Sequence, residues 1–247
     1  MERFLYRLAK SKDAGRFILK GALMLQVWQS PESRPTMDID LLGTIPWDSL
    51  DNRPVIGFSD ATVLHISLFK AGIVSVHGPG LASLGADDQS VMRSVGMHSD
   101  PLLCEGRDTR LPGQLLCGPA KAIRGRLIGG NLTAIASLAG TRHALKADGA
   151  IVVLEDVNEP TYKIERCLWQ LIESNALAGA AGIGFGELTG CDRNDENADS
   201  LQEAVRELVE PLAVPVLWDL PIGHGRRNIA FRQRSGRGRS RAPLATF

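Results

Sequence analysis

Residues 55–80 read VIGFSDATVLHISLFKAGIVSVHGPG, and this stretch contains the pattern that decides the fold class. A short β-branched run at 55–58 leads into a segment at 60–70 with helically spaced apolar residues, and a second apolar run occupies 73–76. A strand, a helix and a strand in this order are typical of a crossover unit in a parallel sheet. The stretch therefore predicts an α/β fold.

The same alternation of strands and helices continues toward the C-terminus. We expect extended segments at 122–128, 151–154, 180–185 and 214–218, and helices at 131–139, 162–174, 201–212 and near 88–95. The first 43 residues differ, because two predicted helices at 3–10 and 17–28 precede a loop and no crossover unit is visible there.

Composition places the chain among ordinary soluble globular proteins. Of its 247 residues 44% are apolar, and 28 basic residues balance 28 acidic ones, so we expect no binding to nucleic acid or to an anionic membrane. Residues 232–247 carry five arginines and no acid, and we predict that this basic tail is disordered. The four cysteines form no C-x-x-C pair and no secretory signal is visible, which favours reduced thiols in the cytoplasm.

A candidate nucleophile lies at the turn between the first predicted strand and its helix. Ser59 follows Gly57 at a sharp strand-to-helix turn, which would project its hydroxyl from the edge of the sheet. The backbone amide of Asp60 would lie at the helix N-terminus, where the dipole favours negative charge, and could form half of an oxyanion hole. The alternative is that Ser59 or Asp60 only caps the helix, as these residue types most often do.

Two further candidates follow later strands. Glu155 and Asp156 come directly after the apolar run 151–154, and acids at the carboxyl end of a parallel strand lie where α/β proteins place their sites. His224 stands between two glycines just after the predicted strand 214–218, which leaves its imidazole unhindered. The alternatives are a solvated or helix-capping acid and a loop histidine bonded to the backbone.

A serine, a carboxylate and a histidine in this chain order match other α/β hydrolases. In such a site His224 would take the proton from the Ser59 hydroxyl and return it to the leaving amine. Glu155 would hold the tautomer of the imidazole and stabilise the imidazolium. The residues therefore predict serine hydrolase chemistry.

Five blocks of the sequence resemble LD-carboxypeptidases: GFSDATVLH, HGPG, GRLIGGNLTAIASLAGT, IVVLEDVNEPTYKIERCLWQL and PVLWDLPIGHGRRN, in this order and spacing. The resemblance covers about residues 45–231, and the family includes the microcin C self-immunity peptidases. It implies an α/β fold in which a truncated Rossmann-like parallel sheet is followed by a smaller α/β carboxy-terminal domain. The catalytic Ser, Glu and His of the family fall on Ser59, Glu155 and His224.

The resemblance also implies a reaction and its setting. Family members are cytoplasmic serine peptidases, often homodimers, that cut the bond from an L-centre to a terminal D-Ala in muropeptides during cell-wall recycling, without a metal or cofactor. By analogy Gly129, Gly130 and Asn131 would lie near the substrate, although a tight strand-to-helix turn explains the same residues equally. An acyl-adenylate is the alternative substrate.

One part of the family pattern has no counterpart in this sequence. Family members carry a glycine-rich loop of the R-G-G-Y-G type before the nucleophile, with an amide that resembles a second oxyanion donor, and nothing before Ser59 matches it. Loss of one such donor typically lowers the rate by about a hundredfold to a thousandfold. We therefore expect impaired catalysis.

Residues 1–43 instead resemble the opening of AbiEii-type nucleotidyltransferase toxins, through Lys20-Gly21 and Asp38-x-Asp40. Residues two apart on a strand share a face, so Asp38 and Asp40 could bind Mg²⁺ and orient a nucleotide triphosphate, although this chemistry needs a third acid. Metal-dependent nucleotidyl transfer and an inactive fusion remnant are thus the alternatives to peptidase activity. The predicted segments are a nucleotidyltransferase-like fragment (1–43), a partial Rossmann-like nucleophile domain (45–120), a carboxy-terminal domain (121–231) and a basic tail (232–247).

Overall fold

The computed structural model describes residues 10, 17–20, 40–43, 55–78, 110–192, 199–225, 227–233 and 245–246. The chain divides into two units, residues 1–53 and 54–247. In the first unit β1 (Phe17–Lys20) pairs antiparallel with β2 (Asp40–Gly43). The helix predicted over 17–28 is therefore wrong at residues 17–20. A short apolar run is compatible with a helix or a strand, and here pairing with β2 stabilises the strand.

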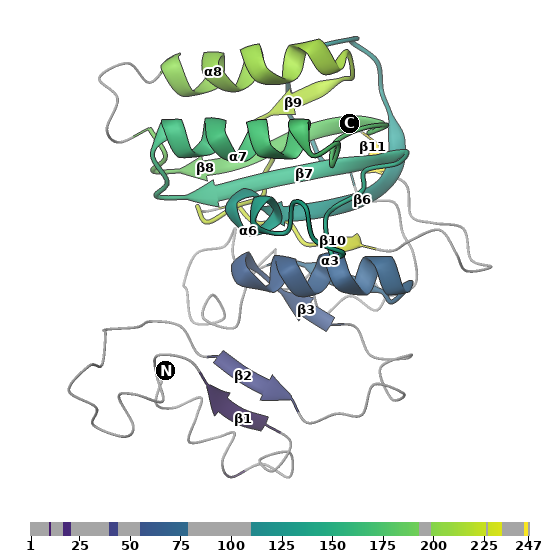
Figure 1. Cartoon of the computed structure of the whole chain (residues 1–247), viewed down its shortest axis with the longest axis vertical. Helices are drawn as coiled ribbons and strands as arrows, with labels where there is room; N and C mark the ends of the chain where they lie inside the picture. The colour runs from purple at the N-terminus through teal and green to yellow at the C-terminus, as the bar shows by residue number, and fades with distance from the viewer. Residues whose placement is uncertain are drawn as a thin grey trace. The chain divides into compact units, whose positions relative to one another are not determined.

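One sheet forms the centre of the second unit, with the strand order β3-β4-β10-β6-β7-β8-β9-β5 among the described residues (Figure 1). The neighbours from β6 to β9 run parallel, as do β3 and β4, whereas β5 is antiparallel to β9 and β10 to β4. The strands are β3 (Val55–Gly57), β4 (Ser75–His77), β5 (Gln114–Cys117), β6 (Arg124–Asn131), β7 (Ala150–Val157), β8 (Gly182–Thr189), β9 (Val216–Trp218), β10 (Phe231–Gln233) and β11 (Ala245–Thr246), which pairs with β6.

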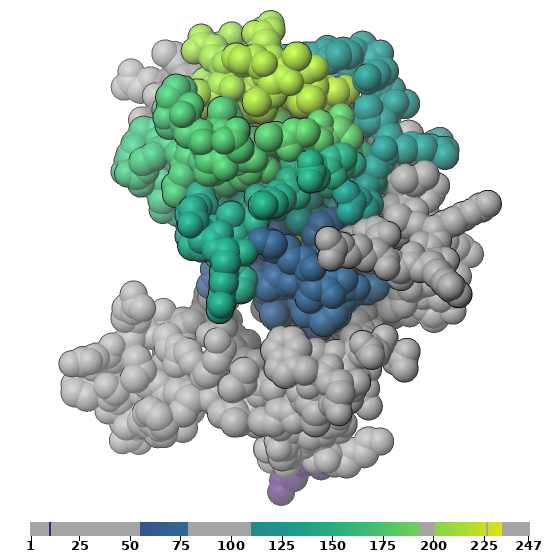
Figure 2. Space-filling view, turned by 45° about the vertical axis from the view of Figure 1, so that its right-hand side comes forward, coloured from purple at the N-terminus to yellow at the C-terminus, as the bar shows by residue number. Residues whose placement is uncertain are grey.

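Helices connect the parallel strands, so the predicted α/β class is confirmed. The short 3₁₀ turn η3 (Ser59–Ala61) continues into α3 (Thr62–Ala71), and α6 (Leu132–Ser137), α7 (Thr161–Glu173) and α8 (Asp199–Val209) follow β6, β7 and β8, with η5 (Glu210–Leu212) after α8. Figure 2 shows the blue segment that carries α3 lying against the teal segment around β6 and α6. The predicted strands and helices between 122 and 218 are observed with ends shifted by a few residues.

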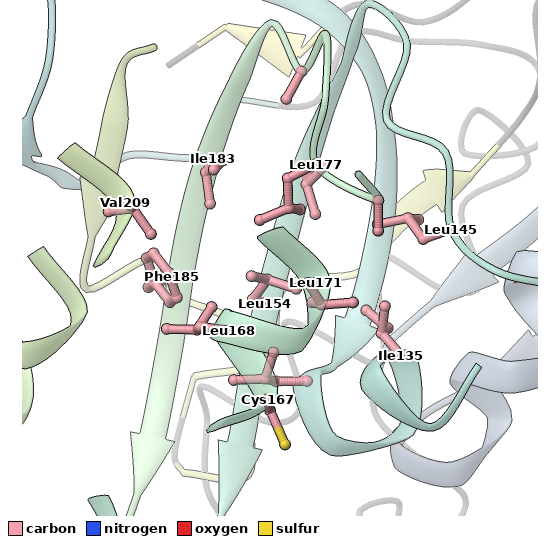
Figure 3. Close-up of a cluster of buried hydrophobic side chains, with 14 of the residues drawn as sticks. Ile135, Leu145, Leu154, Cys167, Leu168, Leu171, Leu177, Ile183, Phe185 and Val209 are labelled. Carbon is pink, nitrogen blue, oxygen red and sulfur yellow. The ribbon is translucent and has the colours of Figure 1, made fainter. Parts of the chain in front are cut away.

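Two apolar clusters cover the two faces of this sheet. Because side chains of a strand alternate between faces, Val152 and Leu154 of β7 pack in the cluster under α6, α7 and α8, whereas Ile151 and Val153 pack in the other. Figure 3 shows Leu168 of α7 in the first cluster. Burial of one such side chain contributes about 1.5–3 kcal/mol, so the clusters fix the carboxyl ends of β6, β7 and β8 relative to each other.

The C-terminal stretch contributes a strand that the sequence analysis missed. Arg232 and Gln233 belong to β10, are buried, and lie between β4 and β6, so the disorder predicted from residue 232 is wrong at its start and also at 245–246, which form β11. Gln233 can be buried here because its side-chain amide forms two hydrogen bonds with the backbone of Gly129. Composition alone does not reveal such a partner.

The predicted domain limits remain predictions, although β3, β4 and β5 from segment 45–120 share one sheet with the strands of 121–231. Three cysteines, Cys117, Cys167 and Cys191, are buried and unpaired. The predicted helix near 88–95 and most of the two predicted helices before residue 29 lie outside the described residues. In the part of the chain that the structure describes, none of the helices has the length and apolar character needed to cross a membrane.

Candidate active site

Ser59 begins the turn η3 at the end of β3. Its φ of 56° lies in the left-handed region, which costs a residue with a side chain roughly 1–3 kcal/mol. Gly57 lets this turn close on the strand, because a Cβ there would lie 2.5 Å from the Cβ of Ala61. The carbonyl of Gly57 accepts hydrogen bonds from the amide of Gly78 at 3.0 Å and from His65 Nε2 at 3.1 Å, so both sides of the turn are held.

Ser59, His224 and Glu155 form a chain of hydrogen bonds. His224 Nε2 lies 3.2 Å from Ser59 Oγ, and His224 Nδ1 lies 2.8 Å from Glu155 Oε2. An ionised carboxylate only accepts, so Nδ1 carries the proton of the neutral imidazole and Nε2 accepts from the Ser59 hydroxyl. In this tautomer the imidazole can act as the base for an attacking hydroxyl.

The carboxyl group of Glu155 is fully buried. Burial raises its pKa, and the hydrogen bond from His224 acts in the opposite direction. The neighbouring charge of Asp156 raises the pKa of Glu155 further. Since Glu155 Oε1 has no hydrogen-bond partner within the described ranges, the charged form depends on its contact with His224.

His224 lies in the loop between β9 and β10. The ring of Phe58, the residue before Ser59, packs on the imidazole with the ring centroids 4.4 Å apart. Gly223 has a φ of 149°, and a Cβ there would lie 2.8 Å from the Cβ of Glu187, so the loop closes tightly on the end of β8. The amide of Glu187 donates to the carbonyl of Ile222 at 2.6 Å, which fixes the loop just before His224.

A group of three charged side chains joins the two ends of this loop. Arg227 Nε donates to Glu187 Oε1 at 3.0 Å, and Arg227 Nη2 donates to Asp219 Oδ1. Asp219 directly follows β9, and Arg227 precedes β10. The guanidinium of Arg227 is thus engaged by two carboxylates of this chain, while the neighbouring Arg226 lies outside the described residues.

The predicted oxyanion donor is the amide of Asp60. Asp60 is the second residue of η3 and is exposed. Amide groups in the first turn of a helix have no partner within the helix, so this N–H is available for a negatively charged oxygen. Its role stays a prediction.

The residues predicted to bind substrate form the end of β6. The carbonyl of Gly129 accepts from Gln233 Nε2 at 2.9 Å, its amide donates to Gln233 Oε1 at 3.3 Å, and a Cβ on Gly130 would overlap with Thr62 Oγ1. The side chain of Asn131 caps α6 and is 7% exposed. Packing and capping explain these three residues, and substrate binding by them stays a prediction.

Several buried polar residues around Ser59 were not found by sequence analysis. Thr62, His65 and His77 are fully buried, and the rings of the two histidines lie 6.2 Å apart. Burial lowers the pKa of His65. Helical spacing could have indicated their burial, because it puts Thr62 and His65 on the same face of α3 as the apolar Ile66. Their polar side chains instead suggested a solvent-exposed face.

A parallel α/β sheet with a Ser–His–Glu chain of hydrogen bonds is the arrangement found in serine hydrolases of the α/β class. The chain is 42% identical to the murein tetrapeptide carboxypeptidase of Pseudomonas aeruginosa, over 77% of this chain and 65% of that protein. It is 30% identical to a putative carboxypeptidase of Synechocystis, slr1534, over 82% of this chain and 68% of that protein. The chain belongs to the LD-carboxypeptidase family.

The other comparisons agree with this family. The family model of the LD-carboxypeptidase C-terminal domain matches residues 124–233. The crystal structure of muramoyltetrapeptide carboxypeptidase from Oxalobacter formigenes is 26% identical, with a TM-score of 0.60 over 78% of this chain and 70% of that one. The chain spans about two thirds of the length of these two carboxypeptidases.

A second family model matches the N-terminal part of the chain. The nucleotidyl transferase AbiEii toxin of a type IV toxin–antitoxin system matches residues 3–64, which extends beyond the fragment predicted at 1–43. Of the two predicted metal ligands, Asp40 begins β2 and Asp38 lies outside the described residues.

Proposed function

We propose that this chain is a serine LD-carboxypeptidase that hydrolyses the bond to the terminal D-Ala of muropeptides. The hydrogen-bond chain from Ser59 through His224 to Glu155 carries this proposal, because it supplies a nucleophile, a base and an orienting carboxylate. The 42% identity to a murein tetrapeptide carboxypeptidase supports the substrate class.

In the proposed reaction the Ser59 hydroxyl attacks the scissile carbonyl while His224 Nε2 takes its proton. The Glu155 carboxylate stabilises the imidazolium that forms. The imidazolium then gives the proton to the amine of the departing D-Ala, which leaves an acyl group on Ser59. Water, activated by the same imidazole, attacks the acyl group and releases the shortened peptide.

The amide of Asp60 is the proposed donor to the oxyanion of the tetrahedral intermediate. Without a second donor of the kind expected from the R-G-G-Y-G loop, the rate would be about a hundredfold to a thousandfold lower than that of a relative that has such a loop. We also propose, from the family resemblance, a cytoplasmic homodimer that needs no metal or cofactor.

The test is release of D-Ala from a muropeptide tetrapeptide by the whole chain, by Ser59→Ala and by the control Ser67→Ala. Ser67 lies on α3, and its hydroxyl bonds only to the carbonyl of Val63 among the described residues. We expect release by the wild-type chain and by Ser67→Ala, and none by Ser59→Ala. Equal rates for the wild type and Ser59→Ala would remove Ser59 as the nucleophile.

Metal-dependent nucleotidyl transfer is the second candidate, because the AbiEii model matches residues 3–64. Its test is transfer of a labelled nucleotide in the presence of Mg²⁺ by the wild-type chain and by Asp38→Ala. Transfer that is unchanged in Asp38→Ala would exclude that residue as a metal ligand.

A further inference from the structure

The two ends of the Ser59–His224–Glu155 chain come from strands that are not neighbours. Three strands, β4, β10 and β6, separate β3 from β7 in the sheet. No strand ladder therefore joins the turn that carries Ser59 directly to the strand that carries Glu155. Contacts between side chains and backbone across these elements must set the spacing of the two groups.

Asp156 is the buried residue next to Glu155. Glu155 bonds to His224, whereas the carboxylate of Asp156 bonds to Thr133 in the first turn of α6. Asp156 is 2% exposed, and no basic side chain among the described residues forms an ion pair with it. Its negative charge needs hydrogen-bond donors inside the protein.

Four donors surround the Asp156 carboxylate. Oδ1 accepts from Asn131 Nδ2 and from the amide of Val157, both at 2.9 Å. Oδ2 accepts from the amide of Thr133 at 2.9 Å and from its hydroxyl at 2.8 Å. These charge-assisted bonds fix the first turn of α6 against the end of β7.

Asn131 continues this connection to the nucleophile. Its side-chain Oδ1 accepts from the backbone amide of Ala134, and its backbone amide donates to Thr62 Oγ1 at 3.0 Å. Thr62 is fully buried and is the first residue of α3, three positions after Ser59. A continuous path of hydrogen bonds thus runs from the residue beside Glu155 to the helix that begins behind Ser59.

We propose that Asp156 is a positioning residue, which sets the place of Ser59 relative to Glu155 through Asn131 and Thr62. The kinetic part of this inference rests on the proposed function. A displacement of about 1 Å at a reacting group can lower the rate about a hundredfold, so a path that is not in contact with the substrate still affects turnover.

The kinetic test compares Asp156→Asn, Thr62→Val and Thr62→Ser with the control Asp148→Asn, an exposed residue that makes the same change of charge. We expect kcat for D-Ala release to fall about tenfold to a hundredfold in Asp156→Asn and Thr62→Val with KM within twofold. Thr62→Ser keeps the hydroxyl and should stay within threefold of wild type. The double variant of Asp156→Asn and Thr62→Val should be no slower than the slower single variant.

Three kinetic results would overturn the positioning role. One is an unchanged kcat in both Asp156→Asn and Thr62→Val, measured well below their melting temperatures. Another is a loss in Thr62→Ser equal to that in Thr62→Val. The third is rate losses that multiply in the double variant, which would mean that Asp156 and Thr62 act independently.

Two readouts do not need muropeptide turnover, so they separate this inference from the proposed function. The first is hydrogen exchange of the Asn131 amide, which should be slow in wild type and faster in Asp156→Asn and Thr62→Val. The second is the rate at which a fluorophosphonate probe labels Ser59, which should fall in the same two variants. A wild type that labels but releases no D-Ala would refute the substrate class alone, whereas unchanged exchange and labelling in both variants would refute the positioning role.

Discussion

Two residues of the candidate site, Ser59 and Glu155, carry a cost in stability. Ser59 has a left-handed backbone, and Glu155 holds a carboxylate in a fully buried position. Both features oppose folding by roughly 1–3 kcal/mol or more. Such residues are retained when the surrounding structure holds them in place, as the hydrogen bonds to Gly57 and His224 do here.

Glu155→Gln should lower activity and raise stability. Burial raises the pKa of Glu155 above 4.5, so the folded state binds the proton more tightly than the unfolded state. Above that raised pKa the ionised group therefore lowers the free energy of unfolding, and an uncharged amide avoids this cost. At pH 7.5 we expect D-Ala release to fall about a thousandfold or more and the melting temperature to rise. A lower melting temperature than that of wild type, with the exposed Glu207→Gln as control, would contradict this expectation.

His65 should make the stability of the protein depend on pH below neutrality. Burial lowers the pKa of His65 below 6.5, so the unfolded state binds its proton more readily. The stability that neutral His65 provides is present above pH 6.5 and is lost as the pH falls toward its lowered pKa, by at most about 1.4 kcal/mol per pH unit. Gln at this position can still donate to the carbonyl of Gly57 but does not titrate. Urea unfolding at pH 7.5 and 5.5 should therefore show a larger loss for wild type than for His65→Gln, and equal losses would argue against a buried neutral imidazole.

At the scale of elements, the loop between β9 and β10 is held at several points around His224. The ion pair between Arg227 and Asp219 joins its two ends. Glu187 of β8 bonds to Arg227 and packs against Gly223 of the loop. Exposed ion pairs stabilise proteins by about 0–1 kcal/mol, so we ascribe to this group an effect on the position of His224 more than on folding.

Arg227→Gln should lower kcat about tenfold and leave KM within twofold, because the guanidinium holds the loop and not the substrate. Asp219→Asn should have an effect in the same direction. If Arg227 instead bound the terminal carboxylate of the substrate, Arg227→Gln would raise KM, and Asp219→Asn would lower it by freeing the guanidinium. Steady-state kinetics of D-Ala release distinguish the two cases, with Arg166→Gln on the exposed face of α7 as the control.

At the scale of the whole molecule, β10 joins two parts of the sheet that are distant in sequence. It pairs with β4 on one side and with β6 on the other, and Phe231 stacks on His77 with ring centroids 4.7 Å apart. The strand β3 leads into Ser59 and pairs with β4. These two strands join the rest of the sheet through β10, which follows His224 in the sequence.

Gln233→Ala should destabilise the chain by about 1–3 kcal/mol, because the buried amide and carbonyl of Gly129 would lose their bonds to this side chain. Urea unfolding measures the change, and the exposed Gln170→Ala should shift the free energy of unfolding by less than about 0.5 kcal/mol. Equal stability of the two variants would show that the Gln233 contacts contribute nothing.

Local pattern predicts the types of most described elements, and it offers three candidate site residues, each with a structural alternative. The runs at 55–58 and 151–154 are strands, and the segment at 162–174 is a helix, because apolar spacing in a short window reports burial directly. Their positions after predicted strands and the family resemblance together indicate Ser59, Glu155 and His224, and their roles stay a prediction. Local pattern failed on α3, where Val63 and Leu64 are exposed, whereas the polar His65 is buried.

The sequence by itself determined the α/β class, the chain order of a serine, a glutamate and a histidine, and the family of the protein. Only the tertiary structure decided that β10 lies between β4 and β6, that Asp156 is linked to Thr62 through Asn131, and that Arg227 is engaged by two carboxylates. These features depend on pairs of residues that lie as far apart in the sequence as Gln233 and Ser75. A window of sequence reports how one segment can be buried, but the partner of a buried polar group is chosen by the packing of the whole chain.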